Sequence, residues 1–248
     1  MIEYFPTKIV AKAKEHAVAE FPKESIGIVV GDRYIPCDNI HEEPEQNARL
    51  EKGVYEYYYP TGCLEAIIHS HIDFPHCSLK DQEAQISTNV PWGIINMRHG
   101  NPVSHWFWGD QLERQEYLGR PFHYGCYDCY GLIRDWFIKE RNIFLPPAPR
   151  GWDFWFEGKN LFEDYLFPRF KNGTWTRISD WRDVEEGDML LFKLNNSPVW
   201  NHSALYIGNG QIMHHLEFKL SKIDLINRWA KLICGIARCN GADENGKA

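Results

Sequence analysis

Three side chains in the second half of the chain have the types and spacing of an acyl-transfer site. Cys129 stands at the start of an apolar-periodic segment that predicts a helix, and His202 opens a segment predicted as strand. His214 follows His202 twelve residues later, across a Gly-Asn-Gly turn. A helix N-terminus and a nearby imidazolium favour a thiolate, and a second polar group holds the imidazole in one tautomer. We predict Cys129 as nucleophile, His202 as base and His214 as orienting residue, which indicates a peptidase or amidase.

A second set of residues, in the first half, has the pattern of a metal site. His69 and His71 are two apart on a predicted strand, so their imidazoles point to the same side. Asp81, at a predicted helix start, can complete a tetrahedral zinc site with an open position for water. Glu24 can take the proton from that water, and Ser78 can donate a hydrogen bond to a developing oxyanion. An H-x-H sequence is also common in polar turns, so the spacing alone leaves both interpretations open.

Other potential ligands are less well placed. Asp73 and His76 lie in the same segment as the two histidines and remain alternatives. The C-x-x-C at 126–129 is compatible with zinc, redox or iron–sulfur chemistry. The cysteines that could pair with it, Cys234 and Cys239, are spaced by four residues rather than two. This spacing argues against a shared four-thiolate site.

Hydrophobic periodicity predicts the elements that must position these residues. In the first half we predict helices at 7–20 and 78–86, and strands at 26–30, 34–36, 64–69, 93–97 and 104–108. In the second half we predict helices at 128–141 and 158–168, and strands at 189–193, 204–207, 211–214 and 233–238. A mixed α/β sheet domain followed by an α+β domain fits this order. We place a polar junction at 109–120 and two domains at 1–111 and 112–248, with a polar, frayed tail at 241–248.

Composition excludes several classes of protein. The formal net charge of −7 argues against a nucleic-acid partner, which needs a basic patch. No segment approaches the roughly eighteen uninterrupted apolar residues of a membrane span. The N-terminus has neither the basic nor the apolar region of a secretory signal, so we expect synthesis in a reducing cytoplasm.

The second-half residues resemble the NlpC-type papain-like cysteine peptidases. The core motifs of that family are D-C-S-G-[LF]-V, which begins here at Asp128, and H-V-G-[IL]-Y-[IL]-G-x-G, which begins at His202. The resemblance implies a papain-like α+β fold and cleavage of peptidoglycan stem peptides at a γ-D-glutamyl bond, without a cofactor. It also implies that Asp128 anchors the free amino end of the substrate. Tyr130 replaces the usual serine, and Phe122 replaces an oxyanion tyrosine for which Tyr124 can substitute.

The first-half residues resemble the JAMM/MPN metallopeptidase motif, an upstream Glu, H-[ST]-H, a seven-residue spacer and S-x-x-D. The resemblance implies one zinc ion and a role for each residue of the set: ligands His69, His71 and Asp81, general acid/base Glu24, and oxyanion donor Ser78. The segment 72–77 is one residue shorter than the family spacer, and Ile72 stands where the family has proline.

The two halves together resemble the K-type tail-tip assembly family of long-tailed bacteriophages. The stretches that carry this resemblance are 119–122, 128–130, 133–136, 149–155 and 212–221. It implies a virion tail-tip component or assembly factor, made in the host cytoplasm, that cleaves peptidoglycan. Its partners would be other tail-tip proteins, including the central hub or fibre protein. The alternative is a structural tail-tip protein with relict peptidase sites.

Overall fold

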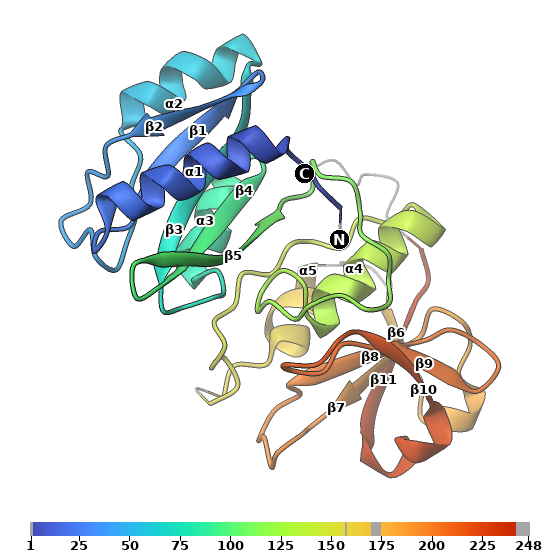
Figure 1. Cartoon of the computed structure of the whole chain (residues 1–248). Helices are drawn as coiled ribbons and strands as arrows, with labels where there is room; N and C mark the ends of the chain where they lie inside the picture. Colours follow the sequence, from blue (N-terminus) through green and yellow to red (C-terminus); the bar gives the residue numbers. More distant parts are fainter. Residues whose placement is uncertain (1, 157, 170–174, 242–248) are drawn as a thin grey trace. The chain divides into compact units, whose positions relative to one another are not determined.

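The computed structural model describes residues 2–156, 158–169 and 175–241 (Figure 1). The chain forms two compact units, Met1–Glu113 and Arg114–Ala248. The sequence-based boundary lies between residues 111 and 112. Each unit has its own sheet, and the mixed α+β architecture predicted from the sequence is confirmed.

The first unit is built on a five-stranded mixed sheet in the order β2-β1-β3-β4-β5. Its strands are β1 (Ile26–Val30), β2 (Arg33–Cys37), β3 (Leu64–Ile72), β4 (Trp92–Arg98) and β5 (Asn101–Trp108). Its helices are α1 (Thr7–Glu20), α2 (Lys52–Tyr58) and α3 (Leu79–Thr88), with a 3₁₀ turn at Tyr59–Thr61. Strands β3 and β4 are parallel and are joined through α3, whereas the other neighbours are antiparallel.

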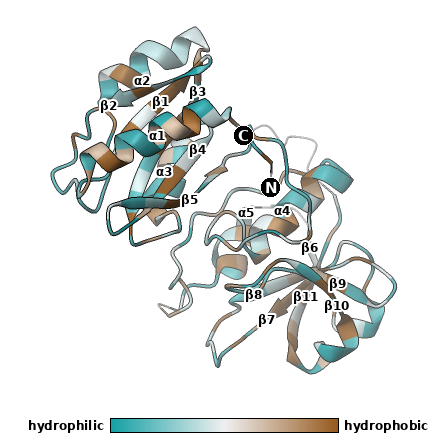
Figure 2. Cartoon of the chain, viewed as in Figure 1, coloured by the Kyte–Doolittle hydropathy of each residue, from teal (hydrophilic) through white to brown (hydrophobic). Residues whose placement is uncertain are grey.

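Helix α1 covers one face of this sheet because its apolar residues recur at helical spacing. Ile9, Val10, Ala13 and Ala17 are buried and belong to one core cluster with residues of β1, β3, β4 and β5. Figure 2 shows apolar and polar segments in turn along α1. Burying each large aliphatic side chain contributes roughly 1.5–3 kcal/mol. This packing holds β3, which carries two of the three predicted zinc ligands, in the middle of the sheet.

The second unit is built on a six-stranded antiparallel sheet in the order β10-β9-β8-β7-β11-β6. Its strands are β6 (Trp175–Arg177), β7 (Met189–Phe192), β8 (His202–Tyr206), β9 (Gln211–His214), β10 (Lys222–Leu225) and β11 (Ile233–Cys239). Its helices are α4 (Cys129–Arg141), a π-helix at Leu161–Leu166 and α5 (Phe167–Arg169). Short 3₁₀ turns lie at Trp181–Asp183, Ile226–Arg228 and Ala230–Leu232.

Helix α4 is the main helix of this unit and begins at Cys129. It buries Leu132, Ile133, Trp136 and Phe137 in one core cluster with residues of β7, β8 and β9. The stripe follows the spacing that predicted the helix. The helix therefore holds its first residue in a fixed place over the sheet.

The structure differs from the predicted elements where local signals are weak. Helix α2 was not predicted because it buries no side chain, so it has no apolar periodicity to detect. Strands β6 and β10 were also not predicted; they have only three and four residues. The helix predicted at 158–168 is the π-helix Leu161–Leu166 followed directly by α5. The predicted frayed tail falls almost wholly on 242–248, outside the described residues.

Among the described residues, no helix is long and apolar enough to cross a membrane.

Candidate peptidase and metal sites

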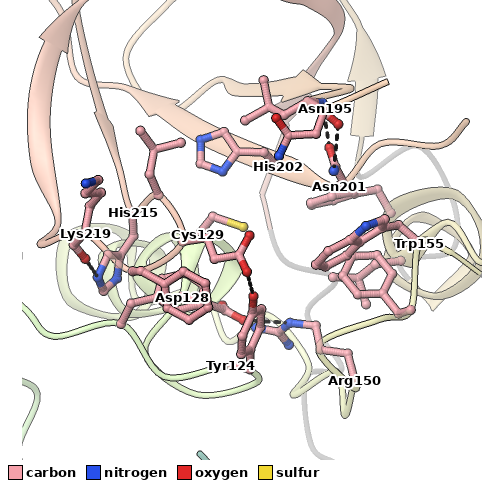
Figure 3. Close-up of a pocket in the computed structure, with 18 residues that line it drawn as sticks. Tyr124, Asp128, Cys129, Arg150, Trp155, Asn195, Asn201, His202, His215 and Lys219 are labelled. Carbon is pink, nitrogen blue, oxygen red and sulfur yellow. Dashed lines mark hydrogen bonds and ion pairs between the residues drawn. The ribbon is translucent and has the colours of Figure 1, made fainter. Parts of the chain in front are cut away.

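Cys129 lies in a cavity of about 280 Å³ in the second unit. It is the first residue of α4, and His202 of β8 lines the same cavity. Figure 3 shows the Cys129 sulfur beside the His202 ring. Gly131 makes this helix start possible, because a Cβ there would meet the carbonyl oxygen of Cys126 at 1.9 Å. The predicted nucleophile and base are thus brought together.

His202 and His214 form the next link. The Nε2 atom of His202 lies 3.2 Å from Nδ1 of His214. Strand pairing explains the contact: Ala204 is opposite His214, so His202 is a diagonal neighbour of His214 on the same face. The structure therefore brings together all three residues predicted for acyl transfer.

Asp224, which was not predicted, contacts His214 and so continues the row of side chains that His202 and His214 form. Its Oδ2 lies 3.1 Å from Nε2 of His214 and also accepts from Lys222 and from the indole of Trp229. Lys222 is opposite His214 on β10, which places Asp224, two residues on, on the same face. The alternation of polar and apolar residues over 222–225 is the signal that could have revealed this strand.

Burial favours the neutral forms of the Cys129 thiol and the His202 imidazole. Burial raises the pKa of the Cys129 thiol to about 11, and the neighbouring Asp128 carboxylate acts in the same direction. Burial, followed by the nearby His214, lowers the pKa of His202 to about 3. The raised pKa of Cys129 runs against the sequence-based expectation that the helix start favours the thiolate, because burial disfavours the charged form of the thiol.

Asp128 has a structural task at the start of α4. Its Oδ1 accepts from Gly131 N–H and its Oδ2 from Gly125 N–H, both at 2.9 Å. Both oxygens also pair with the buried Arg150 guanidinium, which sequence reasoning missed because it comes from a distant loop. Burial raises the pKa of Asp128, but Arg150 outweighs it and the net pKa is lowered. The role of Asp128 as anchor for a substrate amine stays a prediction, and such an amine would have to compete with Arg150.

The departures from the NlpC motif have physical consequences. Tyr130 is fully buried, and its hydroxyl donates a hydrogen bond to the carbonyl of Pro146. The Arg150 guanidinium lies over its ring. Tyr124 lines the cavity, and its hydroxyl donates to Glu217, a partner that the sequence did not suggest. The role of Tyr124 in an oxyanion hole stays a prediction. A tyrosine in place of serine at 130 thus helps to hold Arg150 against Asp128.

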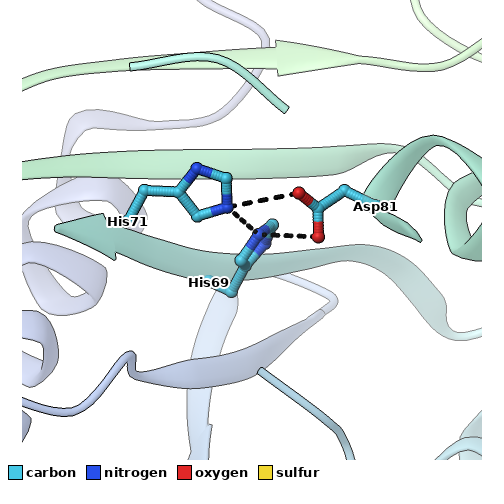
Figure 4. A group of neighbouring side chains, drawn as sticks. All are labelled: His69, His71 and Asp81. Carbon is cyan, nitrogen blue, oxygen red and sulfur yellow. Dashed lines mark hydrogen bonds and ion pairs between the residues drawn. The ribbon is translucent and has the colours of Figure 1, made fainter. Parts of the chain in front are cut away.

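In the first unit, His69, His71 and Asp81 converge on one point (Figure 4). The two imidazole Nε2 atoms are 2.9 Å apart and lie 3.3 and 3.2 Å from the two Asp81 oxygens. The His69–His71 pair ends β3, and Asp81 is held in the first turn of α3 by reciprocal hydrogen bonds with Ser78. One ligand atom from each residue lies within 4.8 Å of the others. The three predicted ligands are therefore brought together despite the short spacer.

The donor set of this cluster fits a divalent metal such as zinc. His71 Nδ1 faces the carbonyl of Phe74 at 3.2 Å, and a carbonyl can only accept, so Nδ1 carries the proton of the neutral ring. The lone pair of its Nε2 then points into the cluster, the arrangement usual for metal-bound histidines. Glu24 is 4% exposed and lines a cavity of about 820 Å³ with His71, Ser78 and Asp81, and burial raises its pKa.

Comparison with known proteins gives the class of the second unit and then the family of the chain. Residues 119–238 match the NlpC/P60 family, so the second unit contains an NlpC/P60 domain. Tail tip assembly protein K of Escherichia phage N15 is 28% identical over 221 residues, which cover 84% of each chain. Tail tip assembly protein K of Escherichia phage lambda is 31% identical over 165 residues, 65% of this chain and 74% of that protein. The chain belongs to the tail tip assembly protein K family, as the sequence motifs predicted.

Solved structures also align with parts of this chain. The crystal structure of the NlpC/p60 domain of peptidoglycan hydrolase SagA aligns with 49% of this chain and 87% of that domain, at 18% identity and a TM-score of 0.32.

Proposed function

We propose that this protein is a phage tail-tip component or assembly factor whose second unit cleaves peptidoglycan stem peptides. The observation that carries the proposal is that Cys129 and His202 line one cavity of an NlpC/P60 domain and that His202 contacts His214. A thiol, a base and an orienting group in this order are what nucleophilic acyl transfer requires. The bond proposed is the γ-D-glutamyl bond to the diamino acid, as in the NlpC-type peptidases that the sequence resembles.

The chemistry follows from the neutral pair. His202 Nε2 faces His214, so Nδ1 is the nitrogen left to take the proton from Cys129 as the sulfur attacks the amide carbonyl. The Cys129 backbone N–H lies in the first turn of a helix, where it has no partner within the helix, and it can donate to the oxyanion. The imidazolium of His202 then gives its proton to the leaving amine. Water hydrolyses the thioester and restores the thiol, with His202 again as base.

In the first unit we propose one zinc ion held by His69, His71 and Asp81. When bound, zinc would supply a polarised water for hydrolysis. Glu24, buried in the same cavity, would accept a proton there, and Ser78 would donate a hydrogen bond through its hydroxyl. The support for this proposal is the convergence of three ligand atoms within 4.8 Å.

The proposed setting is the tail tip of the virion. The K-family relatives are named as tail tip assembly proteins, so we propose neighbouring tail-tip proteins, including the central hub or fibre protein, as partners. The protein would be made and assembled in the host cytoplasm. Peptidoglycan is the proposed substrate.

Cleavage of defined muropeptides tests the enzymatic proposal. Cys129→Ala should lower the rate by on the order of a thousandfold or more, because it removes the nucleophile. Cys126→Ala, which removes a thiol three residues away, should retain most of the rate. Mass spectrometry of the products identifies the bond. Activity that survives Cys129→Ala would show that the wrong nucleophile is named, and a wild-type protein without cleavage would favour a structural role with relict sites.

A further inference from the structure

Asp224 closes a row of hydrogen bonds that begins at the proposed catalytic base. We propose that Asp224 is a positioning residue that fixes the tautomers of His214 and His202, so that His202 presents an unprotonated Nδ1 to Cys129. The inference rests on the peptidase proposal for its effect on rate. The tautomers themselves are a property of the folded protein and can be measured without turnover.

The direction of each hydrogen bond follows from the chemistry of the last group. An ionised carboxylate only accepts, so Nε2 of His214, 3.1 Å from Asp224 Oδ2, must carry the proton. Nδ1 of the neutral His214 ring is then an acceptor. It lies 3.2 Å from Nε2 of His202, which must therefore be the donor. The Nδ1 of neutral His202 is left without a proton, as a base requires.

Two donors hold the accepting oxygen in place. Lys222 Nζ lies 2.8 Å and the Trp229 indole nitrogen 3.2 Å from the same Oδ2 that faces His214. The Trp229 ring also packs against the His214 imidazole, edge to face, with ring centroids 4.7 Å apart. Neither the ammonium nor the indole can accept a hydrogen bond. This oxygen position is consequently an acceptor site whether residue 224 is an aspartate or an asparagine.

The charges around the two rings favour the neutral forms. At His214, burial lowers the pKa and outweighs Asp224, while Lys222 acts in the same direction as burial. At His202, burial comes first and His214 and His215 add to it in opposing protonation, whereas Asp128 favours protonation. With both rings neutral, Asp224 acts by orienting protons that are already present and not by charging His214.

The test combines nitrogen-15 NMR of the histidine side chains with kinetics on the full-length protein. The wild-type spectrum should show a protonated Nε2 and an unprotonated Nδ1 for both His202 and His214. Asp224→Ala should mix the tautomers and lower kcat by about ten- to a hundredfold with little change in KM, by analogy with the loss of a histidine's hydrogen-bond partner at metal sites. Asp224→Asn should keep the tautomers and most of kcat, because Lys222 and Trp229 select its oxygen.

Asp180→Ala is the matched control. Asp180 is an exposed carboxylate that pairs with Arg182 in the same unit, so the control should leave both readouts unchanged. A wild-type His202 with its proton on Nδ1 would overturn the inference even if Asp224→Ala failed to fold. Unchanged spectra and kcat in a folded Asp224→Ala would also overturn it. The predicted tautomers in a protein that cleaves no muropeptide would support the inference and reject the peptidase proposal instead.

Discussion

Each unit of this chain contains two histidines and an aspartate in contact, yet the two sets are arranged differently. In the first unit, both Nε2 atoms and both carboxylate oxygens converge on one point. In the second unit, the contacts run in series, from His202 to His214 and from His214 to Asp224. A convergent set offers lone pairs to a cation, whereas in a serial set each hydrogen bond fixes the orientation of the next imidazole ring. The same residue types therefore support different chemistry.

Secondary structure produces this difference. His69 and His71 are two apart on one strand, so their rings lie side by side, and the start of α3 brings Asp81 to them. His202, His214 and Asp224 come from three adjacent antiparallel strands and share one face of the sheet. Rings on successive strands can each reach only the next, which gives a row.

The largest expected effect is a loss of muropeptide cleavage when residues of the serial set are replaced. The loss should be larger at His202 than at His214. His202→Ala should lower kcat by on the order of a thousandfold or more, since it removes the base. His214→Ala should cost less than His202→Ala, because it removes the orienting partner and leaves the nucleophile and the base in place. A chelator, or His69→Ala with His71→Ala, should leave muropeptide cleavage intact. Chelator-sensitive cleavage would mean that the convergent set does the cutting and would break the comparison.

The next effect concerns which positive partner faces the site aspartate of each unit. Asp81 faces two imidazoles, but Asp128 faces the permanent cation of Arg150. Arg150→Met should leave Asp128 buried without its cation and lower the free energy of unfolding by about 3–5 kcal/mol at pH 7. The measurement is denaturant unfolding. Arg182→Met removes one half of an exposed pair and should leave stability close to that of the wild type.

The same pair predicts a pH dependence. The pKa of Asp128 is lowered in the folded protein, so its contribution to stability is present above the unfolded pKa of about 4. It is lost as the pH falls through the folded value. The stability difference between wild type and Arg150→Met should therefore shrink in acid. A difference that grows in acid would contradict the assignment of the ion pair.

The smallest expected effect is on zinc affinity. Protein purified without chelator should contain one zinc ion per chain, measured by elemental analysis. His69→Ala or His71→Ala should weaken zinc binding by at least about ten- to a hundredfold, since each removes a converging ligand atom. His76→Ala removes a nearby imidazole outside the cluster and is the control. Zinc content unaffected by the loss of both His69 and His71 would reject the site.

The sequence predicted those site residues whose neighbours are determined by local structure. The spacing of His69 and His71 on a strand, the capping position of Ser78 and the helix start at Cys129 are all readable from short windows. The contact of His202 with His214 follows from two strands joined by a tight turn.

The partners that were missed depend on pairings between distant segments. Asp224 joins the row through the register of β9 with β10, which no local pattern specifies. Arg150 reaches Asp128 from a loop 22 residues away, and Glu217 reaches Tyr124 across 93 residues. The upward shift of the Cys129 pKa was missed for a related reason, because burial is a property of the assembled domain and not of the helix start.

The strand order has a further consequence for the working temperature of the protein. Strand β10, which carries Asp224, lies at the end of the described sheet and hydrogen-bonds to β9 alone within it. An end strand opens at a lower free energy than the central strands β7 and β8, which hold α4 and His202. Warming should therefore release Asp224 first, while Cys129 and its helix are still folded. The catalytic rate would then fall at a lower temperature than the one at which the unit unfolds. Opening of β10 would therefore set the upper temperature limit of activity.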